Sequence, residues 1–207
     1  TGKILQATPR IVDKNKREEY FQKGFVTLEN IIPMDWLARL SDCSESLLND
    51  SRVIQEPNDA YDLGPNHSRD QPHVRRLKAL VDRDPLFWEF ASGSIMGDIA
   101  ADLVGADVKF HSSKLNYKWP GSGEIVKWHQ DIPAWPHTNY SPVTLGVYLE
   151  DVTALEGPLL CIPKSHEGPL YFHTDLNGQW TGSISKKDMG SIDLNSAEEL
   201  IGVSGTV

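Results

Sequence analysis

The stretch Lys118-Trp-Pro-Gly-Ser-Gly-Glu-Ile-Val-Lys-Trp-His-Gln-Asp131 decides how we expect the chain to be organised. A Pro-Gly-Ser-Gly turn is followed by β-branched and aromatic residues, which are typical of a strand. Successive side chains of a strand alternate between its two faces, so residues i and i+2 point the same way. We therefore expect His129 and Asp131 to point toward one place in space, and Gln130 to face away.

An imidazole nitrogen and a carboxylate oxygen that meet in this way are common metal ligands. They make up two of the three groups in the 2-His-1-carboxylate set that binds non-haem Fe(II). A His-x-Asp tripeptide is also common as an ordinary surface pair, so the tripeptide alone leaves both interpretations open. The aromatic residues around the tripeptide favour a metal site over a surface pair: Trp119, Trp128 and Trp135.

Three blocks of sequence, taken in order, resemble the phytanoyl-CoA dioxygenase family. They are the stretch 118–131, then Leu-Gly-Val-Tyr-Leu-Glu-Asp-Val at 145–152, then Gly-Pro-Leu-Leu-Cys-Ile-Pro-Lys-Ser-His-Glu-Gly at 157–168. The resemblance is strong over residues 109–170 and weaker on either side. It implies a mainly β fold with a helical annex, whose core is a double-stranded β-helix of the jelly-roll, cupin-like type.

The same resemblance implies an enzyme, a non-haem Fe(II)- and 2-oxoglutarate-dependent dioxygenase. Its expected reaction hydroxylates an aliphatic C–H bond of a small-molecule metabolite, consumes O2, and releases succinate and CO2. By resemblance, His129 and Asp131 are the metal ligands and the catalytic residues. Because related halogenases lack the carboxylate ligand, Asp131 favours hydroxylation.

The resemblance also suggests which residues bind the cosubstrate and the substrate. The far carboxylate of 2-oxoglutarate needs cationic and hydroxyl donors, for which the candidates are Lys114, Thr144 and Arg76. Each of the three is also explained as an ordinary surface group. Trp135 and Gln130 are expected to line the substrate side of the site.

In the family, the third iron ligand is a His that follows a segment corresponding to Ser204-Gly-Thr-Val207, and an Arg farther on pairs with 2-oxoglutarate. We expect both residues beyond Val207. Within the chain, His166 and His173 are weaker candidates for the third ligand.

We expect residues 1–207 to form a single oxygenase domain that is truncated before its last strands. Residues 1–105 are then a mostly helical N-terminal part, and residues 106–207 are the start of the β-helix core.

The amino-acid composition limits which classes of partner we expect the chain to bind. Acidic residues outnumber basic ones 29 to 20, and a net charge of −9 disfavours nucleic acid and anionic membranes as partners. The two cysteines, Cys43 and Cys161, fit no disulfide framework and no metal spacing, which favours a reducing, cytoplasmic compartment. No apolar stretch reaches membrane-spanning length. We expect the partners to be a small-molecule substrate and O2, and the oligomeric state is not indicated.

Hydrophobic periodicity and turn residues predict the remaining elements. We expect an irregular lead-in over 1–12 and a long loop over 51–71. The expected helices cover 14–23, 33–48, 84–90 and 93–104, with a short one over 195–200. The expected strands cover 25–29, 107–118, 124–129, 143–150 and 159–162, and a further strand begins at 202.

Two other functions stay open. One is a catalytically silent binding module that kept the β-helix, which a missing distal His would favour. The other is a cupin-type metalloenzyme that does not use 2-oxoglutarate. Metal analysis separates the binding module from both enzymes, and release of succinate separates the two enzymes from each other.

Overall fold

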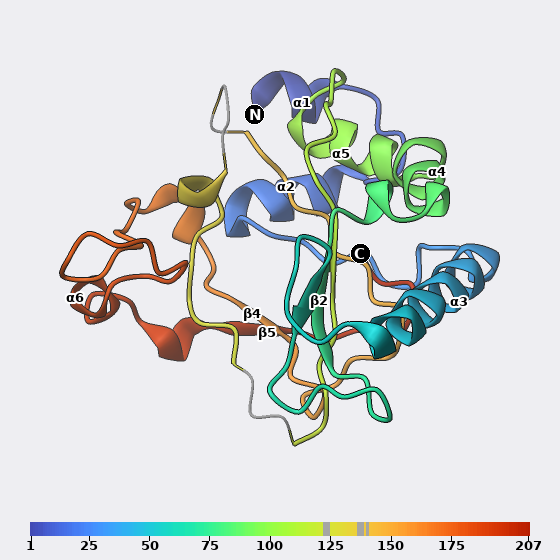
Figure 1. Cartoon of the computed structure of the whole chain (residues 1–207). Helices are drawn as coiled ribbons and strands as arrows, with labels where there is room; N and C mark the ends of the chain where they lie inside the picture. Colours follow the sequence, from blue (N-terminus) through green and yellow to red (C-terminus); the bar gives the residue numbers. More distant parts are fainter. Residues whose placement is uncertain (122–124, 136–138, 140) are drawn as a thin grey trace.

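The structure, a computed structural model, describes residues 1–121, 125–135, 139 and 141–207. Its N-terminal half carries most of the α-helices, and its C-terminal half combines short strands and short helical turns with irregular segments (Figure 1). The helices are α1 (Gly2–Gln6), α2 (Lys14–Lys23), α3 (Met34–Asp50), α4 (Pro85–Gly93), α5 (Met96–Val104) and α6 (Lys186–Met189). The strands are β1 (Tyr61–Leu63), β2 (Val74–Lys78), β3 (Lys114–Asn116), β4 (Leu159–Cys161) and β5 (Glu198–Leu200).

Capping residues explain where two helices of the N-terminal half, α2 and α4, begin. The Asp13 side chain accepts the N–H of Lys16 at the start of α2, and Asp84 accepts the N–H of Leu86 at the start of α4. The bounds of α2 confirm the predicted helix over 14–23. Among the described residues, no helix combines the length and the apolar character needed to cross a membrane.

The hydrophobic core lies among α3, α4, α5 and the sheet β1-β2-β3. Strand β2 is the central strand and is antiparallel to both neighbours. Val74 and Leu77 of β2 and Ile99 of α5 are 0%, 1% and 1% exposed. Burying one such side chain contributes about 1.5–3 kcal/mol. Alternate apolar side chains of the stretch 143–149 pack against the same core: Val143, Leu145, Val147 and Leu149.

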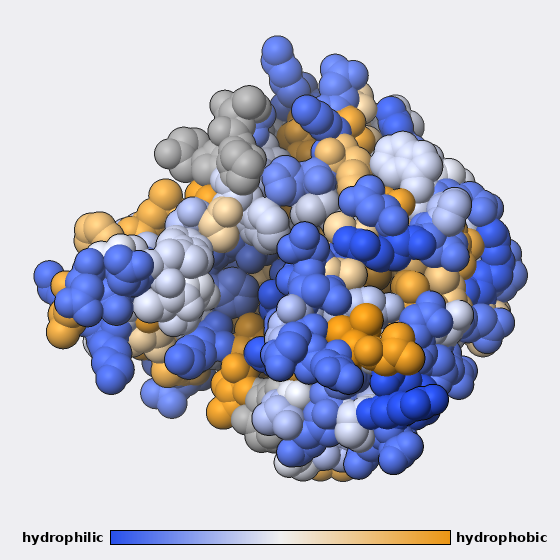
Figure 2. Space-filling view, viewed as in Figure 1, coloured by the Kyte–Doolittle hydropathy of each residue, from blue (hydrophilic) through white to orange (hydrophobic). Residues whose placement is uncertain are grey.

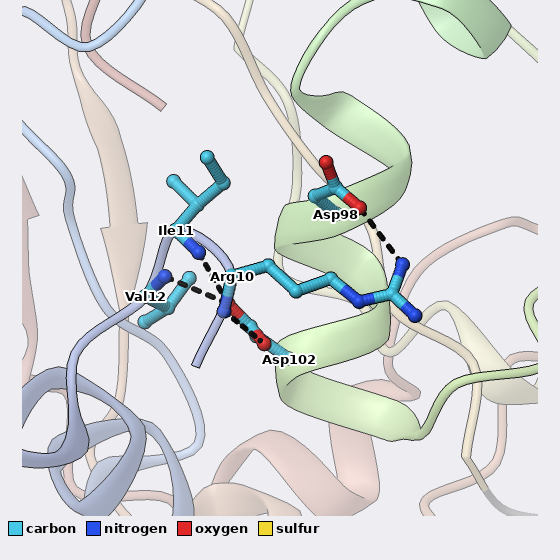
Figure 3. A network of polar contacts seen from close by, with 5 residues as sticks. All are labelled: Arg10, Ile11, Val12, Asp98 and Asp102. Carbon is cyan, nitrogen blue, oxygen red and sulfur yellow. Dashed lines mark hydrogen bonds and ion pairs between the residues drawn. The ribbon is translucent and has the colours of Figure 1, made fainter. Parts of the chain in front are cut away.

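One buried carboxylate holds the segment before α2 against α5 (Figure 3). Asp102 is 5% exposed and accepts the main-chain N–H groups of Arg10, Ile11 and Val12 over 2.7–3.0 Å. Burial raises the pKa of Asp102, but these three N–H donors outweigh burial and hold the pKa below its ordinary value. The Arg10 guanidinium also reaches the exposed Asp98, at 2.8 Å.

The turn at Ile162–Gly168 docks on the C-terminal end of α2. The N–H of Lys164 donates to the carbonyl of Lys23 at 2.7 Å, and Nε2 of His166 lies 3.2 Å from the carbonyl of Phe21. Gly24, which ends α2, has a φ of +89°, and a Cβ there would lie 2.3 Å from Nδ1 of His166. Both the left-handed backbone and the close approach of the ring therefore require glycine.

Several predicted strands of the C-terminal half are not formed. Of the strand expected over 107–118 only β3 is present, and the described residues of 124–129 and 143–150 have no strand assignment. A strand needs a neighbour along its length to pair its N–H and C=O groups. Within the described part of the chain these stretches make only isolated backbone bonds, such as that from Tyr148 N–H to Thr206 O at 2.9 Å.

Other differences concern elements that depend on distant partners. Strand β1 lies inside the predicted loop 51–71, and α1 lies inside the predicted irregular lead-in. The helix predicted over 195–200 is present only as a 3-10 turn over Leu194–Ser196, because Glu198–Leu200 pairs with β4 as β5. The strand expected over 25–29 is absent, although Leu28 and Val207 exchange two main-chain hydrogen bonds. The prediction of a strand over 159–162 is confirmed by β4.

Large apolar side chains are exposed in the C-terminal half. The most exposed include Leu155, Leu170, Phe172, Leu176 and Ile201. Figure 2 shows hydrophobic patches over the part of the molecule that Figure 1 draws in orange and red. Apolar surface of this kind is typical of a face that contacts a further segment or a partner.

We expect Asp102→Asn to lower the free energy of unfolding by about 1.5–3 kcal/mol at neutral pH, because hydrogen bonds to a charged acceptor contribute that much. Asp98→Asn is the matched control. It removes an exposed ion pair and should cost less than about 1 kcal/mol. Because the folded-state pKa of Asp102 is lowered, its stabilisation is complete above the ordinary value of 3.8 and is lost as the pH falls through the folded-state pKa. Urea unfolding of both variants across pH tests this prediction. It is contradicted if the difference in unfolding free energy between Asp102→Asn and wild type stays constant below pH 3.8.

Gly24→Ala should destabilise the protein by more than the roughly 1–2 kcal/mol of a left-handed alanine, because its Cβ also meets His166. The double variant Gly24→Ala/His166→Ala removes the close contact but keeps the backbone strain. Thermal unfolding should show that the double variant loses less stability than the sum of the two single variants. If the stability losses of the two single variants add up to the loss of the double variant, the contact with His166 is not a reason why position 24 requires glycine.

Candidate active site

The side chains of His129 and Asp131 lie close together, as predicted, although residues 125–130 form no strand and Asp131 has a helical backbone. Nε2 of His129 lies 3.5 Å from Oδ1 of Asp131. Nδ1 of His129 lies 2.8 Å from the carbonyl of Lys127, which can only accept, so Nδ1 carries a proton. In the neutral ring the lone pair is then on Nε2, the nitrogen that faces Asp131. The two side chains are 35% and 38% exposed, so both donors are accessible from solvent.

The electrostatics of the pair keep the carboxylate ionised. The imidazole of His129, which donates to the carboxylate from Nε2 when the ring is protonated, lowers the pKa of Asp131 to about 2, against the opposing effect of burial and with further help from the charge of Lys114 and the hydroxyl of Thr144. The same hydrogen bond raises the pKa of His129. At neutral pH Asp131 is therefore an anionic oxygen donor.

The hydroxyl of Thr144 reaches the same carboxylate. Its Oγ1 donates to Oδ2 of Asp131 at 3.1 Å, and so the oxygen that does not face His129 is also held. Sequence comparison suggested Thr144 as a cosubstrate ligand. In the structure its hydroxyl orients the Asp131 carboxylate, and its contact with 2-oxoglutarate stays a prediction.

Lys114, Trp135 and His111 lie together beside the pair. Nζ of Lys114 is 5.8 Å from the centre of the Trp135 ring, and the His111 ring meets Trp135 edge to face at 5.2 Å. The charge of Lys114 contributes to the lowered pKa of Asp131, which ties this cluster to the site. Sequence reasoning missed His111. Its only available signal was its place on the predicted strand over 107–118 that also carries Lys114.

The second cationic candidate, Arg76, lies on the same sheet as Lys114. Arg76 pairs with Asn116 across β2 and β3, and its Nε donates to Oδ1 of Asn116 at 3.0 Å. Lys78 pairs with Lys114 in the same register, so Arg76 and Lys114 project from one face of the sheet. Among the described residues, Arg76 makes no hydrogen bond or ion pair with His129 or Asp131.

Gln130 faces away from the pair, as predicted. Its Oε1 accepts the N–H of Tyr171 at 2.8 Å, and its Nε2 donates to the carbonyl of Pro169 at 3.0 Å. Both ends of the amide are thus bonded to the segment at 169–171. The expected place of Gln130 on the substrate side stays a prediction.

The pair provides two donors of a metal site. Two ligands about 2.1 Å from one ion and at right angles lie close to 3 Å apart, a separation similar to the 3.5 Å between Nε2 and Oδ1. Among the residues that the structure describes, no group of three His, Cys, Asp or Glu side chains could hold a metal. His166 bonds to α2 and His173 uses both ring nitrogens within the chain. The third ligand expected beyond Val207 stays a prediction.

Known proteins resemble the chain over most of its length. A probable alpha-ketoglutarate-dependent hypophosphite dioxygenase of Stutzerimonas stutzeri is 27% identical over 198 residues, which are 93% of this chain and 68% of that protein. An ectoine dioxygenase of Sphingopyxis alaskensis is 28% identical over 189 residues, which are 89% of this chain and 60% of that protein. The chain thus spans about two thirds or less of the length of these relatives.

A solved structure shows the same fold. The crystal structure of EctD from S. alaskensis with bound Fe superposes with a TM-score of 0.71 at 23% identity, over 97% of this chain and 69% of that one. The family model described as phytanoyl-CoA dioxygenase matches residues 20–190, well over half of the chain. The chain therefore belongs to the phytanoyl-CoA dioxygenase family.

Proposed function

We propose that the complete protein is an Fe(II)- and 2-oxoglutarate-dependent dioxygenase that hydroxylates a small-molecule metabolite and releases succinate and CO2. The observation that carries this proposal is the pair of His129 Nε2 and Asp131 Oδ1, 3.5 Å apart, accessible, and set in a chain of this family. The named relatives act on hypophosphite and on ectoine, both small polar molecules, which supports a substrate of that size.

Each residue of the pair has a defined task in this proposal. Bound Fe(II), together with 2-oxoglutarate and O2, supplies the oxidising chemistry. His129 provides a neutral nitrogen donor, and its bond to the Lys127 carbonyl fixes which nitrogen is free. Asp131 provides an anionic oxygen donor, and the hydroxyl of Thr144 restricts rotation of its carboxylate.

The surroundings of the pair support a placement for the cosubstrate and the substrate. We place the far carboxylate of 2-oxoglutarate near the sheet face that carries Lys114 and Arg76, because a carboxylate is best held by cations. Trp135, beside Lys114, then forms a wall on the substrate side, with Gln130 behind the ligand-bearing segment.

The proposal also includes features outside the described residues. A third His ligand and an Arg for 2-oxoglutarate follow Val207, and the strands that complete a double-stranded β-helix accompany them. Residues 1–207 then belong to one oxygenase domain. The exposed apolar side chains of the C-terminal half support this, since added strands would cover them.

We expect His129→Ala and Asp131→Ala in the complete protein to abolish Fe(II) binding and turnover, because each removes one donor. Asp131→Glu should also lose most of its activity, since one added methylene moves the carboxylate by more than the roughly 0.2 Å tolerance of a metal–ligand distance. Asp107→Ala, at an exposed carboxylate, is the control. Iron analysis and succinate release are the measurements.

The outcomes of that experiment separate the candidate functions. A wild-type protein that binds iron but releases no succinate is a metalloenzyme of another kind, and one that binds no iron is a binding module. Native turnover by Asp131→Glu would show that Asp131 does not bind the metal.

We expect Thr144→Val to weaken binding of Fe(II) in the absence of 2-oxoglutarate, because the hydroxyl holds Oδ2 of Asp131. Thr144→Ser keeps a hydroxyl and should bind Fe(II) like the wild type. Titration with Fe(II), then with 2-oxoglutarate, tests both sites. A Val variant that loses affinity only for 2-oxoglutarate would show that Thr144 serves the cosubstrate alone. In that case the loss of binding free energy for 2-oxoglutarate should be about 1.5–3 kcal/mol, the value of a hydrogen bond to a charged group.

A further inference from the structure

A second histidine holds the segment that carries the pair. His173 is 2% exposed, and its Nε2 accepts the main-chain N–H of Gln130 at 2.9 Å. Its Nδ1 lies 2.9 Å from the carbonyl of Tyr171. Because Nε2 must offer a lone pair to Gln130, the ring proton is on Nδ1 and is donated to Tyr171. The ring is therefore fixed as one neutral tautomer with both nitrogens bonded.

Neighbouring groups hold the ring and the backbone of His173. Trp180 stacks on it with 5.4 Å between the ring centres and 16° between the planes, and the N–H of Thr181 donates to the His173 carbonyl at 2.9 Å. A flipped ring would place carbon atoms opposite the Gln130 N–H and the Tyr171 carbonyl. Two partly buried backbone groups would then lose their hydrogen-bond partners.

The bond to Gln130 acts on both members of the pair. The N–H of Gln130 belongs to the peptide plane that joins it to His129, so holding that N–H fixes the backbone rotation on both sides of the plane. His129 and Asp131 are attached directly before and after Gln130. The same stretch is also held by the Gln130 side chain and by the bond from Ile184 N–H to the Trp128 carbonyl at 2.9 Å.

No ladder of strands does this for the described residues at 125–130, which have no strand assignment. In a regular sheet a neighbouring strand would fix the plane of each peptide. Here an imidazole takes the place of the main-chain acceptor. A bond of this kind near a metal ligand is the sort of support whose loss weakens metal binding by about 10–100-fold.

We propose that His173 is a positioning residue for the metal centre: its Nε2 fixes the Gln130 peptide and thereby sets the directions of the His129 and Asp131 side chains. This inference rests on the proposed function, because it needs the pair to bind metal. This positioning role requires a hydrogen-bond acceptor at Nε2. A side chain that only packs in the interior would need the volume of the ring but no acceptor.

The test uses the complete protein and three substitutions of His173. His173→Leu fills the space without an acceptor, and His173→Gln places an amide oxygen where Nε2 lies. His173→Asn keeps a donor for the Tyr171 carbonyl but does not reach Gln130, and it replaces the Leu variant if that protein does not fold.

The matched control is His67→Leu. His67 makes the same kind of bond, from the main-chain N–H of His73 to its Nδ1 at 2.9 Å, and its Nε2 lies 3.1 Å from the carbonyl of Ser51. It belongs to the loop before β2, so it reports the cost of losing such a bond away from the pair.

Three quantities are measured: the dissociation constant for Fe(II) without oxygen, the ligand-field absorption spectrum of bound Co(II), and the melting temperature of the metal-free protein. We expect His173→Leu or His173→Asn to weaken Fe(II) binding by about 10–100-fold and to change the Co(II) spectrum. His173→Gln should restore most of the affinity. His67→Leu should lower the melting temperature and leave both metal readouts unchanged.

The possible results decide between the proposals. Wild-type affinity and an unchanged Co(II) spectrum in His173→Leu or His173→Asn overturn the positioning role. So does an equal loss of affinity in His67→Leu, or in His173→Gln, because the acceptor would then not be the cause. A wild-type protein that binds neither metal overturns the proposed function itself, and with it the premise of this inference.

Discussion

The main chain of residues 205–207 is bonded on both of its edges, and this joins the two halves of the molecule. On one edge, Leu28 and Val207 exchange two main-chain hydrogen bonds of 2.8 and 3.0 Å. On the other edge, Tyr148 donates to Thr206 at 2.9 Å and accepts from Gly205 at 2.8 Å. The stretch that carries Thr144 is thereby placed against the helical half, where its alternate apolar side chains enter the core. Thr144, on the opposite face of that stretch, then reaches Asp131.

The segment that carries Asp131 is held in a different way, although the physical requirement is the same. Main-chain N–H and C=O groups that leave water need partners, and a sheet supplies them in regular order. The main-chain N–H of Gln130 donates to an imidazole nitrogen of His173, and the Gln130 side-chain amide bonds to the carbonyl of Pro169 and the N–H of Tyr171. Such side-chain support is specific to single peptides, so it can fix one pair of side chains without a continuous ladder. The site therefore depends on the segment over 169–184 as much as on its own residues.

Local rules of sequence predicted part of this arrangement well. The helix over 14–23 and the approach of His129 to Asp131 both follow from residues that are close to one another in sequence. Features set by distant residues were not predictable in the same way. Strand β2 forms because β1 and β3 flank it, and β5 forms because β4 lies beside it and outweighs a local preference for helix. The contact of Thr144 with Asp131 required the fold, since no spacing rule joins them.

The two histidines that matter most at the site show why a motif alone does not assign a role. Each follows an aromatic residue, and each places Nδ1 against the carbonyl two residues earlier, at 2.8 Å for His129 and 2.9 Å for His173. The rings thus have the same tautomer, and their chemistry differs only at Nε2. For His129 that nitrogen faces the carboxylate of Asp131 and open solvent, so a metal can reach it. For His173 it faces the Gln130 N–H, 43 residues away in sequence, and the ring is buried. Because the first partner is two residues away, the sequence itself suggests a metal ligand, as we propose for His129. Because the second partner comes from another segment, only the folded chain shows that the same side chain serves there as a support.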